Sequence, residues 1–194
     1  MRQSCSYSGV RLHARVGSAS VVEMDGWEAW QGQRDDGAVE SEQRVALRAP
    51  GVEFSVTGAE QLGRAYWREV ERITGRLVQA RERNGSIQLR LLGHGPSLLR
   101  FGQPAFEATT THVCCTYPIE GGLLARRPAG EIIFAQVGGP MPVVRSAIRG
   151  FFPSLAARTG EPGWTGALYN RVQSRIHLAV SRRYFARLIA ETHE

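Results

Sequence analysis

Apolar residues recur at helical spacing in two stretches of the chain. The first stretch, residues 58–74, follows Thr57 and Glu60, which have the spacing of a capping box, and precedes Gly75, where a helix commonly ends. The second stretch, residues 166–191, forms one apolar stripe. The stripe consists of Tyr169, Val172, Ile176, Val180 and Tyr184. We therefore expect one helix near the start of the fold and a longer helix at its C-terminal end.

Between these two stretches the apolar residues follow a period of two, which is typical of β-strands. Asn84-Gly85 separates two such runs and predicts a tight hairpin turn. The strand-like runs are residues 76–83, 86–92, 97–101, 106–108, 112–119, 131–137 and 143–152. The pattern predicts an α+β fold: an antiparallel sheet of about six strands, with the long C-terminal helix packed across it.

Residues 1–42 differ from the rest of the chain, because they are rich in Ser, Gly and acidic groups and show no clear period. We expect them to form a polar tail that is disordered or loosely attached, followed by a single domain over residues 43–194. Residues 1–20 lack the apolar stretch of a signal peptide, and no apolar run reaches the roughly 18 residues of a membrane span. The expected location is the cytoplasm.

The net charge of +6 comes from 24 basic residues, all of which are arginine. An arginine-rich chain without lysine, and with many Ala and Gly residues, is typical of a GC-rich bacterial genome. The charge therefore does not by itself predict a nucleic-acid-binding surface. Arg171, Arg175 and Arg182 fall on one side of the last helix. This face is either solvated or the binding surface of an interaction module for an acidic partner.

The sequence predicts neither a metal site nor a cofactor. His112 and Cys114 would share one face of a strand, but no further ligands follow at a suitable spacing. Cys115 shares the other face with Val113 and Tyr117, which indicates a buried thiol. The paired glycines of the chain do not fit a phosphate-binding loop, and the absence of lysine excludes a P-loop.

Acid–base chemistry has two candidate residues, His94 and Glu120, which both stand at predicted strand ends beside glycines. The alternative interpretation is that both simply form turns. Aspartate occurs only at positions 25, 35 and 36, outside the predicted domain, which weakens a hydrolase interpretation.

Residues 112–136 resemble the middle strands of a known superfamily. The resemblance is carried by Val113-Cys114-Cys115-Thr116-Tyr117-Pro118-Ile119-Glu120-Gly121-Gly122-Leu123 and by Gly130-Glu131-Ile132-Ile133-Phe134. Together with the order of elements over residues 45–191, they resemble the START-like (SRPBCC, helix-grip) superfamily. That superfamily usually has two short helices between its first two strands, whereas this sequence predicts one.

The resemblance implies a curved sheet that encloses an apolar cavity against the long helix. It also implies binding of a lipid, a polyketide or another apolar small molecule, or a cyclase- or dehydratase-like enzyme that uses the same cavity. The cavity would be lined by Leu89, Leu91, Tyr117, Phe134, Ile148 and Ile176. Arg100 and Glu120 would orient a polar end of the ligand. The sequence leaves the oligomeric state open.

Overall fold

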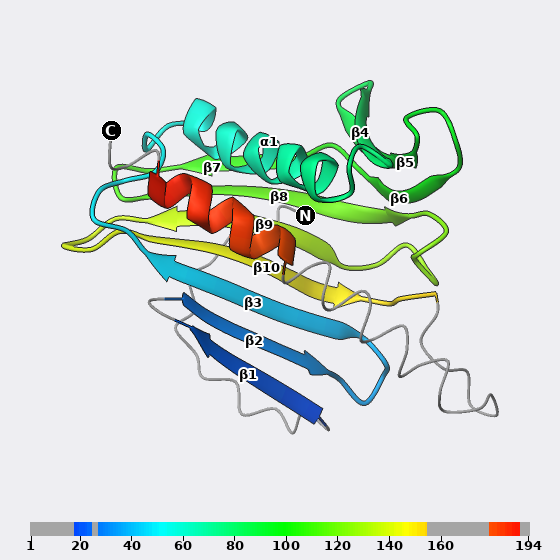
Figure 1. The fold of residues 1–194 in the computed structure, drawn as a ribbon, viewed down its shortest axis with the longest axis horizontal. Helices are drawn as coiled ribbons and strands as arrows, with labels where there is room; N and C mark the ends of the chain where they lie inside the picture. Colours follow the sequence, from blue (N-terminus) through cyan, green and yellow to red (C-terminus); the bar gives the residue numbers. More distant parts are fainter. Residues whose placement is uncertain (1–17, 25–26, 155–178, 191–194) are drawn as a thin grey trace.

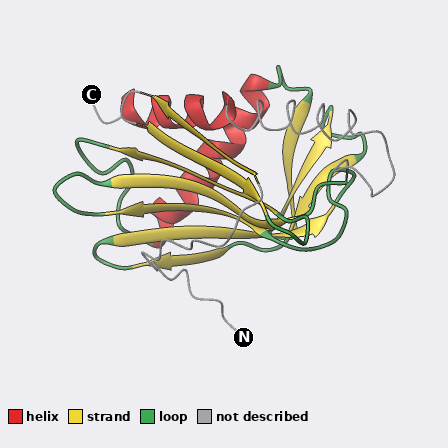
Figure 2. Ribbon diagram, turned by 90° about the horizontal axis from the view of Figure 1, so that it is seen from below, coloured by secondary structure: helices red, strands yellow, loops and turns green. Residues whose placement is uncertain are grey.

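The computed structural model describes residues 18–24, 27–154 and 179–190, which form an α+β fold with two helical segments on one face of an antiparallel sheet (Figure 1). Figure 2 shows both helical segments on the same side of the strands. The helical segments are α1 (Val56–Ile73) and residues 179–190. The strands are β1 (Ser18–Met24), β2 (Trp27–Gln33), β3 (Val39–Ala46), β4 (Val78–Arg83), β5 (Ser86–Leu91), β6 (Ser97–Phe101), β7 (Ala105–Ala108), β8 (His112–Gly121), β9 (Glu131–Val137) and β10 (Val143–Phe151).

The order of the strands differs from their order along the chain. The sheet runs β1-β2-β3-β10-β9-β8-β6-β5-β4, and β7 pairs with β8 beside this path. All of the strand pairs are antiparallel. The described part of the chain thus forms a ten-stranded sheet, and the expectation of about six strands was too low.

Most of the additional strands lie in the N-terminal region, where the sequence predicted a tail before residue 43. Strands β1, β2 and β3 instead extend the sheet, and β3 joins it through β10. Trp27 and Ala29 of β2 and Val45 of β3 are buried on the sheet. The prediction of a loosely attached tail is therefore wrong from Ser18 onward, apart from residues 25–26, which the structure does not describe. The alternation of apolar and polar residues could not be recognised in β3, because the polar residues Ser41 and Gln43 occupy its buried positions.

Helix α1 begins slightly earlier than the sequence predicted. The N-cap is Ser55, whose extended backbone lets its hydroxyl accept a hydrogen bond from the Gly58 N–H at 3.1 Å. The capping box proposed for Thr57 and Glu60 is therefore wrong, because Thr57 already belongs to the first helical turn. The end of the helix is as predicted: Thr74 is the C-cap and Gly75 follows with a positive φ of 58°.

The hairpin predicted at Asn84-Gly85 is confirmed, and both residues have positive φ angles, 52° and 75°. The predicted strands from β4 to β10 are present within one or two residues of their expected bounds. The predicted C-terminal helix is present over residues 179–190; its expected earlier part, including Ile176, lies outside the described residues.

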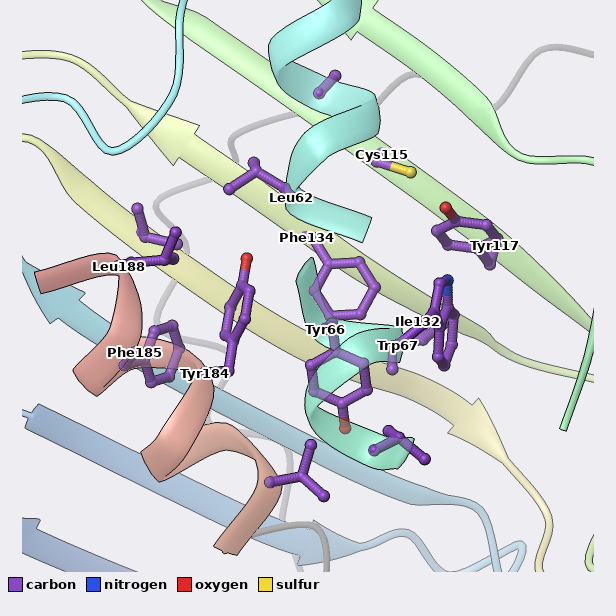
Figure 3. Close-up of a cluster of buried hydrophobic side chains, with 14 of the residues drawn as sticks. Leu62, Tyr66, Trp67, Cys115, Tyr117, Ile132, Phe134, Tyr184, Phe185 and Leu188 are labelled. Atoms are coloured by element: carbon purple, nitrogen blue, oxygen red, sulfur yellow. The ribbon is translucent and has the colours of Figure 1, made fainter. Parts of the chain in front are cut away.

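An aromatic core fills the space between the helices and the sheet (Figure 3). The Tyr66 ring of α1 lies 4.6 Å from the Phe134 ring of β9, measured between centroids, and Trp67 lies 5.0 Å from Phe101 of β6. Gly63 allows α1 to approach β8 closely, because a Cβ atom at this position would overlap the Tyr117 hydroxyl. Strand alternation places a smaller cluster on the opposite side of the sheet. It consists of Cys114, Ile133, Ala135 and Ala147.

Candidate ligand site

The helical residues 179–190 place one row of side chains against the sheet. Val180, Ser181, Tyr184, Phe185 and Leu188 are all buried at helical spacing. Figure 3 shows Tyr184, Phe185 and Leu188 turned from this helix toward the same interior as α1 and the central strands. This interior, between the helix and strands β2, β3, β10 and β9, is the candidate site.

Aromatic rings form the apolar wall of this interior. The Tyr184 ring lies 5.6 Å from the Tyr66 ring and 6.0 Å from the Phe134 ring, measured between centroids. Trp27 of β2 contacts Phe185 edge-on at 6.2 Å. Aromatic rings of α1, of strands β2 and β9 and of the C-terminal helix therefore pack together, although these elements are distant in the sequence.

Polar side chains lie within this apolar interior, on adjacent strands. Gln43 of β3 stands directly opposite Ser146 of β10, and Ser41 lies two residues before Gln43 on the same face of β3. All three side chains are buried. Within the described part of the chain, neither the Gln43 Oε1 atom nor the Ser146 Oγ atom has a hydrogen-bond partner. Buried polar atoms are nearly always paired, so these two need an explanation.

Tyrosine hydroxyls add to this polar cluster from the helices. The Tyr184 hydroxyl is buried and has no hydrogen-bond partner among residues 18–24, 27–154 and 179–190. The Tyr66 hydroxyl interacts with Ser181 of the C-terminal helix. Burial raises the pKa of both tyrosines well above the usual value, so both hydroxyls stay neutral. We use the name neutral cluster for Ser41, Gln43, Tyr66, Ser146, Ser181 and Tyr184.

Buried charge is confined to one ion-pair group between the helices. Glu69 of α1 is the one charged side chain that is buried among the described residues. Arg72 pairs with it from the next helical turn, and Arg187 of the C-terminal helix approaches its carboxylate at 3.6 Å. The two half-exposed guanidinium groups neutralise the carboxylate and link the two helices.

Four of the predicted lining residues pack as expected, on the helix-facing side of the sheet. Leu89, Tyr117 and Phe134 are buried in the main core, and Ile148 is half-buried against it. Tyr117 and Phe134 are part of the aromatic core, 6.2 Å apart between ring centroids. Their place in the core is compatible with a lining role, which stays a prediction. Ile176 lies outside the described residues.

The remaining predicted site residues are not enclosed in this interior. Leu91 lies on the same face of β5 as Leu89 but is 39% exposed, because it is the last residue of the strand, so the expectation that it is enclosed in the interior is wrong. Arg100 and Glu120 are exposed because they alternate with the buried Phe101 and Ile119 on neighbouring strands. They cannot orient a ligand in the core without a change of strand register.

The candidates for acid–base catalysis are also outside the interior. His94 is exposed in the turn after β5, and Glu120 is exposed near the end of β8. The structure does not bring these two residues together with the aromatic core. The enzymatic interpretation that relied on them therefore has no geometric support.

The cysteine and metal alternatives have clear structural outcomes in the described residues. Cys115 is fully buried, and burial raises the pKa of its thiol to about 12, which keeps it protonated and unreactive. His112 is half-buried at the start of β8, and burial together with Arg145 lowers its pKa. Across the described ranges, no three His, Cys, Asp or Glu side chains are grouped to hold a metal ion.

Of the three arginines expected on one face of the last helix, the structure describes Arg182. Arg182 lies over the Trp27 ring, 5.5 Å from its centroid, while Arg187 contacts Glu69. Arg171 and Arg175 lie outside the described residues. Arg182, the member of the predicted face that the structure describes, and Arg187, which lies elsewhere on the helix, therefore both contact the domain itself.

Sequence reasoning missed the neutral cluster. Ser41 was assigned to the tail and Gln43 was only the first residue of the predicted domain, although both alternate with the more exposed Glu42 and Arg44. Ser146 could have been found, because it lies between Val144 and Ile148 and therefore faces the same side of its strand.

Comparisons with known proteins find structural likeness only. No protein-family model and no curated protein matches the chain. The human StarD13 (DLC2) lipid transfer and protein localization domain matches with a TM-score of 0.45 and 12% identity, over 87% of this chain and 89% of that one. Human STARD10 matches with a TM-score of 0.41 and 11% identity, over 84% and 73%. Ara h 8.0201 matches with a TM-score of 0.32 and 12% identity, over 76% and 97%.

Because the identities are 11–12% and the TM-scores are below 0.5, we transfer no ligand, activity or residue role from these structures. In the parts of the chain that are described, no helix has the length and apolar composition to cross a membrane.

Proposed function

We propose that this protein binds an apolar small molecule between the helix-facing side of the sheet and helical residues 179–190. The observation that carries the proposal is the set of buried polar atoms without partners in the described structure: Gln43 Oε1, Ser146 Oγ and the Tyr184 hydroxyl. Each such atom costs roughly 1–3 kcal/mol when it is left unpaired. A bound molecule that supplies hydrogen bonds there would recover this free energy.

The surroundings of these atoms favour an apolar ligand. Tyr66, Phe134 and Phe185 contribute aromatic surface beside the polar atoms, a combination that is typical of small-molecule sites. Because Ser146 and Tyr184 are fully buried, access requires the C-terminal helix to move away from the sheet. The ligand would then occupy space that the side chains fill in its absence.

Titration with N-phenyl-1-naphthylamine, an uncharged apolar fluorophore, tests the proposal. We expect saturable binding at one site per chain and a higher melting temperature in the presence of the probe. Ser146→Leu should weaken binding at least fivefold, because it adds a bulky side chain between β10 and the helix. Thr116→Leu, on the opposite face of the sheet, is the matched control and should leave binding unchanged.

Two results would contradict the proposal: absence of saturable binding to the wild type, or equal weakening by both substitutions. If Ser146→Leu does not fold, Ser146→Ala can replace it, with an expected two- to tenfold change in affinity for a hydrogen-bonding ligand such as dodecanol.

A further inference from the structure

We infer that the ligand carries an uncharged hydrogen-bonding head group, such as an alcohol or a primary amide, and not a carboxylate or phosphate. This inference rests on the proposed function and assigns the chemical class of the molecule bound at the same site.

The neutral cluster contains only groups without charge. Its members are serine and tyrosine hydroxyls and one glutamine amide, and burial keeps the tyrosines protonated. A hydroxyl can donate or accept a hydrogen bond, and an amide offers both an acceptor and donors. Such a set matches a head group that donates one hydrogen bond and accepts another.

In the described structure the arginines near this interior have other partners or face away from it, and the exposed Arg182 lies over the Trp27 ring. Arg72 and Arg187 are engaged with Glu69. Arg145 neighbours Ser146 on β10, but strand alternation directs it to the other face, where its strand partner is Ala135. A buried carboxylate without a cation is strongly unfavourable, so an ionised ligand would bind much more weakly than its neutral analogue.

The geometry of the sheet indicates how a neutral head group would be held. Gln43 and Ser146 are paired across β3 and β10, so their side chains project from the sheet side by side. A ligand hydroxyl or N–H would donate to Gln43 Oε1, and the ligand oxygen would accept from the Ser146 hydroxyl. The Tyr184 ring lies 6.0 Å from the Phe134 ring, measured between centroids, and Phe134 is the β9 partner of Ser146.

A competition experiment with ligands of equal chain length tests the inference. Bound N-phenyl-1-naphthylamine is displaced from the full chain by dodecanol, dodecanamide, dodecanoate and dodecane at about pH 8, below their aggregation limits. We expect dodecanol and dodecanamide to bind at least tenfold more tightly than dodecanoate. They should also bind more tightly than dodecane, which has the same chain but no head group.

Variants assign this preference to the neutral cluster. Gln43→Leu and Ser146→Ala should each reduce the affinity for dodecanol about 2- to 10-fold, the effect of one neutral hydrogen bond, and leave dodecane affinity almost unchanged. Gln103→Leu replaces an exposed glutamine and serves as the control. It should alter neither affinity.

The failure of this inference can be distinguished from the failure of the proposed function. If the probe binds but dodecanoate displaces it as well as dodecanol does, the head-group inference is overturned and apolar binding stands. If dodecanol is preferred equally in wild type, Gln43→Leu and Ser146→Ala, the assignment to the neutral cluster is overturned. If neither the probe nor any of the four compounds binds, both conclusions are overturned.

Discussion

The helix-facing side of the sheet carries two buried glutamines, Gln136 on β9 and Gln43 on β3, whose hydrogen bonding differs. The Gln136 Oε1 atom accepts hydrogen bonds from the N–H groups of Gly51 at 2.7 Å and Val52 at 3.0 Å, and its Nε2 atom donates to the Val52 carbonyl at 2.7 Å. The Gln43 Oε1 atom is buried without any such partner in the described structure.

The two glutamines therefore serve different purposes in the same fold. Gln136 forms hydrogen bonds with backbone groups of the loop between β3 and α1, and these bonds hold the loop in position. The Gln43 Oε1 atom makes no comparable contribution, and the free energy of burying this atom is not recovered within the described chain. The comparison separates a polar group that stabilises the fold from one that is available for a ligand.

Gln136→Leu should have the largest effect on stability. It removes three hydrogen bonds and leaves the amide groups of Gly51 and Val52 unpaired, so we expect a loss of about 2–4 kcal/mol in the free energy of unfolding. Urea denaturation monitored by tryptophan fluorescence measures this loss. A change below about 0.5 kcal/mol would show that the loop does not depend on Gln136.

Glu69→Gln should have an intermediate effect, because it weakens the link between α1 and the C-terminal helix. The carboxylate is buried, but its partners Arg72 and Arg187 are half-exposed, so we expect a loss of about 1–2 kcal/mol. Urea denaturation at low and high salt measures it, and the loss should be smaller at high salt.

Glu60→Gln is the matched control for Glu69→Gln. Glu60 pairs with Arg64 on the exposed face of α1 and should contribute less than about 0.5 kcal/mol. Equal losses for the two substitutions would contradict a special role of Glu69 in holding the C-terminal helix.

Gln43→Leu should have the smallest effect on the stability of the ligand-free protein, even though Gln43 is as deeply buried as a core residue. Because its Oε1 atom has no partner in the described chain, replacement by leucine should change the free energy of unfolding by less than about 1 kcal/mol, in the stabilising direction. Urea denaturation beside Gln136→Leu measures the difference. A loss as large as that of Gln136→Leu would remove the distinction between the two glutamines.

The central and C-terminal parts of the sheet could be predicted from the sequence because local signals define them. Asn84-Gly85 fixes a hairpin, and the alternation of Val113, Cys115 and Tyr117 correctly indicates a buried face. These signals depend only on neighbouring residues and therefore do not require knowledge of the partner strand.

The N-terminal strands and the neutral cluster could not be predicted in the same way. Ser41 and Gln43 occupy inward positions that the pattern assigns to apolar residues, so the tail was predicted to reach residue 42 and the strand was not recognised. The prediction for Leu91 was wrong for the opposite reason. Leu91 is apolar and continues the period of two, but it is exposed because it lies outside the hydrophobic core. Which positions are enclosed depends on strand order, and β10 comes to lie beside β3 through a pairing that no local signal specifies.

The pairing of β3 with β10 also has a consequence for how the chain folds. Strand β3, residues 39–46, cannot pair with β10 until residues 143–151 are available. This part of the sheet therefore depends on contacts between residues about one hundred positions apart. Closing so large a loop is entropically costly, and folds dominated by such contacts form slowly. During synthesis, β3 emerges with one edge unpaired until nearly the whole sheet has been made. Strands β1–β3 are therefore the part of this protein that most needs protection from aggregation before folding is complete.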